Sequence, residues 1–299
     1  MLSLFGALPF CLSGETPNYV DALFEIVSGF TTTGASILSD VEALSRCNLY
    51  WRSFSHWLGG MGILVFLLAV VPEARKSAGS GMYLMRAESP GPSVGKLTPH
   101  LRQTALILYG LYMLLTVLCI GFLLLGGMPL FDSLCIAFGT AGTGGFAIRN
   151  SGMADYSAYL QNVVTVFMFL FGVNFSLYYL LLLRQFKSVF KNEELRVYAG
   201  IAVGAFVLIT IDISRMYGSV REALHHAAFQ VSSIMTTTGF ASVDFEQWPA
   251  FSKAVLLALM FVGACAGSTA GGLKVSRVLL LLKSIRRTVR RAIPPRRVQ

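Results

Sequence analysis

Long apolar stretches alternate with short ones along this chain, and polar turns separate the two kinds. Two long stretches, Leu101–Gly126 and Ala158–Leu183, exceed the roughly 18 apolar residues that indicate a membrane-spanning helix. Further long helices are expected near Phe54–Val71, Val197–Ile213 and Ser252–Leu282. The short stretches have about ten to twelve residues, too few to cross a bilayer. The pattern therefore predicts an all-α integral membrane protein.

A short stretch that ends in threonine and glycine occurs three times. The copies are Phe24–Gly34, Leu134–Gly144 and Phe229–Gly239, each with an apolar residue ten positions before the glycine. In each copy one long helix precedes the short stretch and another follows it. A long helix, a re-entrant half-helix, a Thr/Gly loop and a second long helix make a pore-loop unit, written M1–P–M2. The sequence thus predicts repeated, potassium-channel-like units.

The repeated loop predicts an aqueous path through the membrane. Bare loop backbone at membrane depth is stable only where it lines water or is buried in protein. Thr/Gly turns that cap interfacial helices, with no pore, are the alternative.

The repeat also divides the chain into units. The expected divisions are unit 1 at 1–76, whose first helix is only the stub Met1–Leu12, a cytoplasmic linker at 77–100, unit 2 at 101–190, unit 3 at 191–290 and a basic cytoplasmic segment at 291–299.

The residue types in the three loops suit a monovalent cation. Glycine reaches positive φ without a side chain, so a Thr-Thr-Gly loop can turn successive carbonyl groups toward one axis. Rings of carbonyl oxygens replace the water shell of a dehydrated ion. The three loops contain neither Asp nor Glu, whereas a pore for divalent cations favours carboxylates. The loops therefore predict passage of K⁺, Rb⁺ or Na⁺ rather than Ca²⁺ or Mg²⁺, with the ion as substrate and no cofactor.

The second long helix of unit 3 is interrupted. Glycines and a Ser-Thr pair inside an apolar run favour an unwound segment over a regular helix. Unwound backbone below a filter can act as a gate, and tight helix packing through small residues is the alternative. A phosphate-binding loop is excluded, because a leucine precedes the lysine and no strand precedes the loop. The expected gating residues are Gly263, Gly267, Ser268, Thr269, Gly271, Gly272 and Lys274.

Composition and charge agree with a membrane as the main partner. Hydrophobic residues make up 55% of the chain and charged residues 13%, and a soluble domain usually has about twice that charged fraction. The net charge is +9. Its basic residues concentrate in segments 72–103, 184–196 and 277–299, which places these in the cytoplasm. The bilayer explains the excess without nucleic acid. Acidic residues in the remaining loops either attract cations or are ordinary solvated charges.

No enzyme signature is present in the sequence. The four histidines, His56, His100, His225 and His226, form no metal-binding pair at helical spacing, and no nucleophile elbow occurs. We therefore expect that the protein is not an enzyme. Trp51, Arg52 and Trp57 are expected to be interfacial anchors where the first closing helix enters the membrane.

Several motifs together resemble the Trk/Ktr/HKT superfamily of potassium transporters, and most closely the bacterial TrkH-like subunits. They are Ser28-Gly-Phe-Thr-Thr-Thr-Gly-Ala-Ser36, Trp57-Leu-Gly-Gly-Met-Gly62, Thr143-Gly-Gly-Phe146, Met235-Thr-Thr-Thr-Gly-Phe240 and Ala266-Gly-Ser-Thr-Ala-Gly-Gly-Leu-Lys274. The resemblance covers essentially the whole chain. It implies a multi-pass protein of the cytoplasmic (inner) membrane that takes up potassium, a monovalent cation transporter of the Trk system.

The resemblance also implies four units around one pore, with a selectivity filter of carbonyl groups and the unit 3 interruption as its gating loop. Glycine at all visible filter positions resembles the potassium-selective pattern. The implied filter residues are Thr32, Thr33, Gly34, Gly142, Thr143, Gly144, Thr237, Thr238 and Gly239.

The implied partners are membrane lipid, a second copy in a homodimer, and a cytoplasmic nucleotide-binding ring of the TrkA/KtrA type. We expect that the start of unit 1 and all of a fourth unit are missing, so that this chain alone does not conduct. A non-conducting scaffold or regulatory membrane subunit is the alternative function.

Overall fold

Helices make up nearly all the regular structure in the part of the chain that the structure, a computed structural model, describes: residues 2–62 and 101–292. A lone bridge between Val262 and Leu273 is the only β-type pairing in these two ranges. The prediction of an all-α fold is confirmed. The expected linker at 77–100, the end of the expected helix Phe54–Val71 and the last residues of the basic segment lie outside the described residues.

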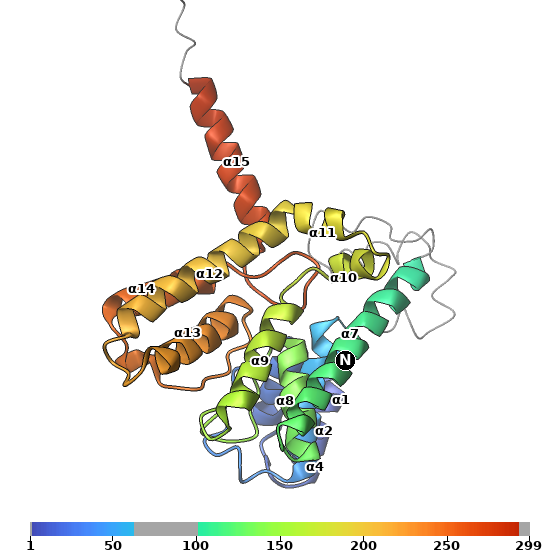
Figure 1. Ribbon diagram of the computed structural model, residues 1–299. Coiled ribbons are helices and arrows are strands. Elements are labelled where there is room, and N and C mark those ends of the chain that lie inside the picture. The colour runs from blue at the N-terminus through green and yellow to red at the C-terminus, as the bar shows by residue number, and fades with distance from the viewer. Residues whose placement is uncertain (1, 63–100, 293–299) are drawn as a thin grey trace, which may run out of the picture.

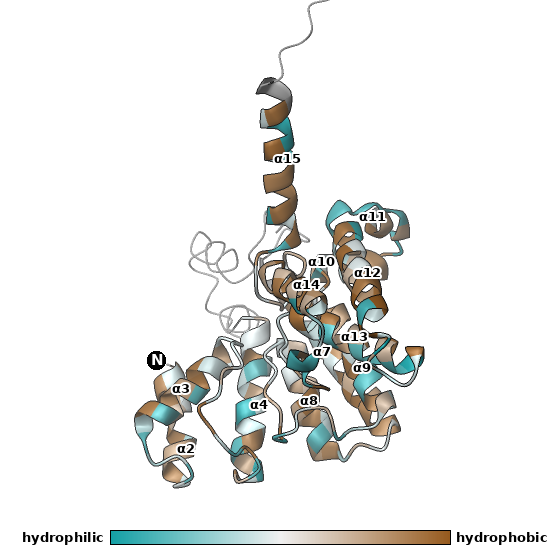
Figure 2. Ribbon diagram, turned by 90° about the vertical axis from the view of Figure 1, so that its left-hand side faces the viewer, coloured by the Kyte–Doolittle hydropathy of each residue, from teal (hydrophilic) through white to brown (hydrophobic). Residues whose placement is uncertain are grey.

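The described part of unit 1, residues 2–62, contains four helices. The stub is bent into α1 (Leu2–Gly6) and α2 (Leu8–Leu12), the half-helix is α3 (Tyr19–Phe30), and the closing helix α4 runs from Arg46 to Gly60. The closing helix thus begins eight residues before the expected Phe54, because the side chain of Ser45 caps its first turn by accepting from Asn48 N–H. Figure 2 shows white and teal segments along much of α4, which is far less apolar than a lipid-facing helix.

Among the described residues, two helices are long and apolar enough to cross a membrane, on length and composition: α7 (Leu101–Leu125), counted from Gln103, and α12 (Glu193–Ile213). The exposed side chains along α7 are mainly large and apolar, as a lipid-facing surface requires. These helices are the first helices of units 2 and 3. The half-helices α8 (Leu130–Gly142) and α13 (Val220–Met235) follow them. With 13 and 16 residues, both remain shorter than the roughly 20 residues that span a bilayer.

The closing helix of unit 2 is broken, whereas the sequence predicts one helix over Ala158–Leu183. It consists of α9 (Ala158–Phe171) and α10 (Phe175–Leu182), which meet at 91°. Asn174 begins the second piece, because its side-chain oxygen accepts from Ser176 N–H at 2.8 Å. This Asx cap competes with a continuous helix. The short helix α11 (Phe186–Lys191) leads from there to unit 3.

The closing helix of unit 3 is interrupted where the sequence predicts it. Helix α14 (Ala250–Phe261) ends, residues 262–274 form a non-helical segment named here the interruption loop, and α15 (Val275–Ala292) begins after Lys274. Figure 1 shows α15 extending away from the other helices. A short 3₁₀ helix, Phe245–Gln247, precedes α14.

The largest buried cluster among the described residues joins α4, α7, α8 and α9. Trp57 is 6% exposed, stacks on Tyr112 with ring centroids 5.3 Å apart, and donates its indole N–H to Thr116 Oγ1 at 3.1 Å. Arg52 is 3% exposed. The expectation that Trp57 and Arg52 are interfacial anchors is therefore wrong. Both side chains lie on the part of α4 that other helices cover, so they meet protein and not lipid headgroups.

Candidate functional site

Three loops with the same backbone follow the C-terminal ends of α3, α8 and α13. Each has a threonine in the left-handed region and, two residues later, a glycine at positive φ. After the role expected from the sequence, we name them filter loop 1 (Thr31–Gly34), filter loop 2 (Gly142–Gly145) and filter loop 3 (Thr236–Gly239). The threonine φ values are 52° at Thr32, 51° at Thr143 and 57° at Thr237, and those of the glycines are 76° at Gly34, 78° at Gly145 and 82° at Gly239.

Backbone hydrogen bonds fix how the three loops correspond. The residue after the left-handed threonine donates its N–H to the carbonyl five residues earlier in every loop: Thr33 to Ser28 at 2.9 Å, Gly144 to Gly139 at 3.1 Å, and Thr238 to Ser233 at 2.9 Å. Gly144 is thus the counterpart of Thr33 and Thr238, and Gly145 is the counterpart of Gly34 and Gly239. The sequence repeat aligned Gly144 with those two glycines, one position away from the structural register.

The filter loops touch one another through backbone. A Cβ atom built on Gly34 would lie 1.9 Å from the carbonyl oxygen of Gly144, and one on Gly145 would lie 1.9 Å from that of Thr238. Such contacts leave no room for any side chain. Loop 1 therefore packs on loop 2 and loop 2 on loop 3. On the third glycine, Gly239, an added Cβ would meet no described atom within 4 Å.

The carbonyl oxygens of Thr33, Gly144 and Thr238 receive no hydrogen bond from the described residues. The nearby hydroxyls are already used inside the loops: Thr31 Oγ1 and Thr33 Oγ1 lie 2.8 Å apart, as do those of Thr236 and Thr238. Gly144 and Thr238 are buried residues, and a buried carbonyl without a partner is costly unless water or an ion meets it, whereas Thr33 is exposed. The three filter loops consequently offer oxygen ligands, without carboxylates, at one place in the fold.

The interruption loop closes the gap between the broken helices. At its base Gly263 N–H donates to Leu273 O at 2.8 Å, and Val275 N–H to Ala264 O at 3.1 Å. Its flank docks on the break between α9 and α10, where Cys265 N–H donates to Gly172 O and Phe175 N–H to Gly267 O, both at 3.0 Å. Each interruption thus supplies partners for backbone groups that the other leaves unpaired.

The tip of the interruption loop contacts the filter loops. Gly271 N–H donates to Thr237 Oγ1 at 2.7 Å, and Thr143 Oγ1 donates to Thr269 O at 3.0 Å. Both partners are the left-handed threonines of their loops. Lys274, 4% exposed, donates back to Ala270 O. The remaining expected gating residues lie in the same loop. Gly263 has no room for a Cβ, because Gly271 O lies beside it, and Gly267 and Gly272 have positive φ. Ser268 Oγ donates a hydrogen bond to Cys265 O.

Four polar residues near the site escaped the sequence analysis as site residues. Glu25 and Arg52 form a buried ion pair behind filter loop 1, and His56 stacks on Phe146 behind filter loop 2 with ring centroids 3.9 Å apart. Glu194, at the start of α12, accepts from the N–H groups of Ala266 at 2.7 Å and Ser276 at 3.2 Å. The sequence contains one signal for these residues, which is a glutamate inside the apolar stretch 24–30, because an isolated charge there needs a buried partner.

Three acidic residues, Asp40, Glu42 and Asp132, bond to residues of other segments. Asn150 Nδ2 donates to Asp40 Oδ1 at 2.7 Å and holds the pKa of that carboxyl below its ordinary value, while Asn150 N–H donates to Glu42 Oε1. These bonds join unit 1 to unit 2. Asp132 likewise accepts from Tyr156 and pairs with Arg149. These three acids therefore bond to protein groups as well as to solvent, which the interpretation as ordinary solvated charges does not include.

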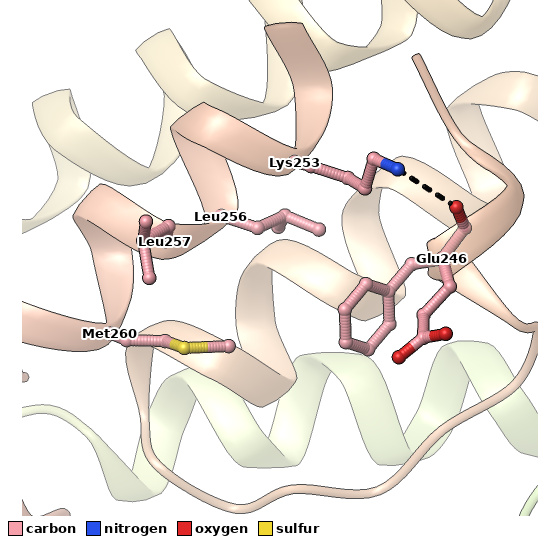
Figure 3. Close-up of a pocket in the computed structure, with 6 residues that line it drawn as sticks. Glu246, Lys253, Leu256, Leu257 and Met260 are labelled. Carbon is pink, nitrogen blue, oxygen red and sulfur yellow. Dashed lines mark hydrogen bonds between the residues drawn. The ribbon is translucent and has the colours of Figure 1, made fainter. Parts of the chain in front are cut away.

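A shallow hollow beside α14 is separate from the filter loops. Figure 3 shows its lining, in which Lys253 Nζ donates to the main-chain oxygen of Glu246 at 3.1 Å. The lining residues come only from α14 and the 3₁₀ helix before it: Phe245, Glu246, Lys253, Leu256, Leu257 and Met260. With mostly apolar walls, it offers no ring of oxygen ligands.

Half-helices, glycine loops and apolar helices around them define the fold class of a pore-loop membrane protein. The profile of the TrkH family, described as a cation transport protein, matches residues 1–214 and 205–299. The chain belongs to the TrkH family, and it is a multi-pass protein of the cytoplasmic (inner) membrane. The resemblance to TrkH-like proteins in the sequence is confirmed, and the family is one of transporters rather than enzymes.

Individual relatives give the same result. The Trk system potassium uptake protein TrkH of Escherichia coli K12 is 38% identical over 305 residues, covering 100% of this chain and 62% of the relative. TrkG of the same organism is 36% identical over 302 residues. The crystal structure of the potassium transporter TrkH from Vibrio parahaemolyticus matches with a TM-score of 0.83 at 33% identity, over 100% of this chain and 62% of that one. The chain thus spans about 62% of the length of these relatives.

Proposed function

We propose that this chain forms part of a potassium-uptake pathway across the cytoplasmic membrane. The observation that carries the proposal is the threefold occurrence of one filter-loop backbone, with free carbonyl oxygens at matching positions. Carbonyl dipoles bind a dehydrated monovalent cation without trapping it. The relatives at 36–38% identity are named potassium uptake proteins, which supports K⁺ as the substrate.

The proposed filter comprises the residues expected from the sequence together with Gly145. Thr32, Thr143 and Thr237 set the turn, and Gly34, Gly145 and Gly239 allow close approach of the backbone. Three such loops enclose an axis only in part, so transport needs a further unit beside filter loop 3, where Gly239 faces open space. Assays therefore use the full-length protein. A homodimer and a cytoplasmic nucleotide-binding ring remain the proposed partners.

Serine at Gly239 is expected to lower the preference for Rb⁺ over Na⁺ in the full-length protein. The site has space for the side chain, but φ is 82°, a conformation that costs a non-glycine residue about 1–3 kcal/mol. Relaxation of that strain shifts the loop carbonyls, and a change of about 1.4 kcal/mol between the ions is a tenfold change in preference. Rb⁺ and Na⁺ flux into proteoliposomes measures it. An unsubstituted protein that moves neither ion under any gating condition would favour the scaffold alternative.

We further propose that the interruption loop is the gate of this pathway. Its tip bonds to the threonines of filter loops 2 and 3, so it lies against the filter itself. One carboxylate joins the loop to the first turn of α15, since Glu194 accepts from the N–H groups of Ala266 and Ser276. Movement of the loop tip away from the filter loops therefore requires that its bonds to Thr143 and Thr237 break, and the bonds of Glu194 oppose such a movement.

Alanine at Glu194 is expected to raise basal Rb⁺ flux about tenfold, because loss of charge-assisted hydrogen bonds worth about 1.5–3 kcal/mol destabilises the observed loop position. Glu193 provides the matched control, as its neighbouring carboxylate is exposed and pairs with Lys283 on the surface. Alanine at Glu193 should leave the basal flux unchanged. Equal flux in the two variants would contradict the role of Glu194 in holding the loop.

A further inference from the structure

One buried ion pair lies behind the filter loops. Glu25 of α3 and Arg52 of α4 are joined by Arg52 Nε and Glu25 Oε2 at 3.0 Å, with side chains 1% and 4% exposed. Buried ion pairs seldom add net stability, because desolvation of both charges offsets their attraction unless the remaining polar atoms are also satisfied. The partners of those remaining atoms therefore show what the pair does.

The remaining atoms of Glu25 hold the segment after filter loop 1. Its Oε1 accepts from Ser36 Oγ at 2.7 Å and from Ile37 N–H at 2.6 Å. These residues come two and three positions after Gly34. A charged acceptor shared by a side chain and a backbone N–H is among the stronger hydrogen-bonding arrangements. It fixes the direction in which the chain leaves the loop.

The remaining atoms of Arg52 do the same for filter loop 2. Its Nη1 donates to Ala147 O at 3.0 Å, and its guanidinium carbon lies 3.6 Å from the centre of the Phe146 ring. Phe146 and Ala147 directly follow Gly145. The planar guanidinium thus combines an ion pair, a backbone hydrogen bond and a stacking contact, which a lysine cannot do. One ion pair therefore ties the outgoing segments of two filter loops to each other.

Unit 3 offers a natural comparison. Gln230 has the place of Glu25 in α13, nine residues before Gly239 as Glu25 is before Gly34. It is buried and donates from Nε2 to Val243 O at 3.1 Å. A neutral amide is thus enough to anchor one outgoing segment to its own half-helix. The charged pair is needed where one element must hold two loops at once.

We propose that the Glu25–Arg52 pair is a positioning brace that sets the ion preference of the filter, by fixing the segments behind Gly34 and Gly145. The inference rests on the proposed transport function. Neither side chain needs to touch the ion, because both act on the loop backbone. Loss of the brace lets the carbonyl groups of loops 1 and 2 adapt to a smaller ion, so Na⁺ passes more readily.

The test compares Rb⁺ and Na⁺ flux in proteoliposomes of the full-length protein with Glu25→Gln, Arg52→Gln, Arg52→Lys and the double variant Glu25→Gln/Arg52→Gln. The single Gln variants should lower the Rb⁺/Na⁺ ratio about tenfold, as the loss of a buried charge-assisted bond implies. Arg52→Lys keeps the positive charge but lacks the planar guanidinium, and it should give an intermediate Rb⁺/Na⁺ ratio. Lys283→Gln, which removes an exposed ion pair, is the control and should keep the ratio.

The double variant separates positioning from stability. It leaves no unpaired buried charge, so its thermal stability should exceed that of either single Gln variant while its ion ratio stays low. If the double variant regained the Rb⁺/Na⁺ ratio of the unsubstituted protein together with its thermal stability, the proposed brace would be refuted. A proportional loss of both fluxes at an unchanged ratio, with the unsubstituted protein still selective, would refute it as well. An unsubstituted protein that transports neither ion would instead refute the proposed function, and the brace with it.

Discussion

Alanine at Gly145 is expected to reduce Rb⁺ uptake by the full-length protein about 100-fold. A Cβ there would lie 1.9 Å from the backbone oxygen of Thr238, and φ is 78°. Left-handed backbone strain costs a non-glycine residue about 1–3 kcal/mol and overpacking about as much again. Neither can be relieved by a side-chain movement, since both partners are backbone. The combined cost of roughly 3 kcal/mol corresponds to the expected loss.

Gly144 provides the comparison that tests the loop register. The three atoms nearest an added Cβ there all belong to the ring of His56, the first at 2.5 Å, and Gly144 is not among the residues at positive φ. Alanine at Gly144 should therefore also reduce Rb⁺ uptake. The double variant Gly144→Ala/His56→Ala should take up Rb⁺ as fast as His56→Ala alone, because the ring that the Cβ would meet is gone. The same background should not relieve Gly145→Ala. Rb⁺ uptake in cells without other potassium-uptake systems measures all four variants. Equal failure of both double variants would refute the structural register of filter loop 2.

Alanine at Gly60 is expected to lower the melting temperature of the purified protein by about 5–10 °C, from a cost of about 3 kcal/mol and the usual shift for a domain of this size. Gly60 lies at the end of α4, where an added Cβ would be 2.6 Å from Gly142 Cα and 2.9 Å from Tyr112 Oη. Helices α4 and α8 therefore meet backbone to backbone. They can separate only if filter loop 2, which begins at Gly142, moves with them.

Gly121 is the matched control for Gly60, since no described atom lies within 4 Å of an added Cβ on this α7 residue. Alanine there should keep or raise the melting temperature, because alanine is favoured over glycine in a helix by about 1 kcal/mol. Thermal denaturation followed by size-exclusion chromatography in detergent distinguishes the two. A melting temperature that falls equally for both variants would show that glycine content, and not the α4–α8 contact, determines stability.

The sequence by itself determined the class of fold and the location of the candidate site. Apolar runs too long for a soluble core, such as Leu101–Gly126, indicate a membrane protein because the cost of exposing them to water depends on length and composition alone. The three Thr/Gly turns and the glycine-rich stretch in Gly263–Lys274 are likewise local signals. Glycine and threonine restrict the backbone wherever they occur, so the loops and the interruption in unit 3 could be predicted without knowledge of their neighbours.

Only the tertiary structure decided which of these segments meet, and in which register. Thr143-Gly144 resembles Thr33-Gly34 in letters, yet hydrogen bonds to the preceding half-helix place Gly145 in the equivalent position. The break at Asn174 is stable because the interruption loop supplies its backbone partners. Arg52 is buried because Glu25, 27 residues earlier, neutralises it. Each of these outcomes depends on a partner distant in sequence, and local preference carries no information about such a partner.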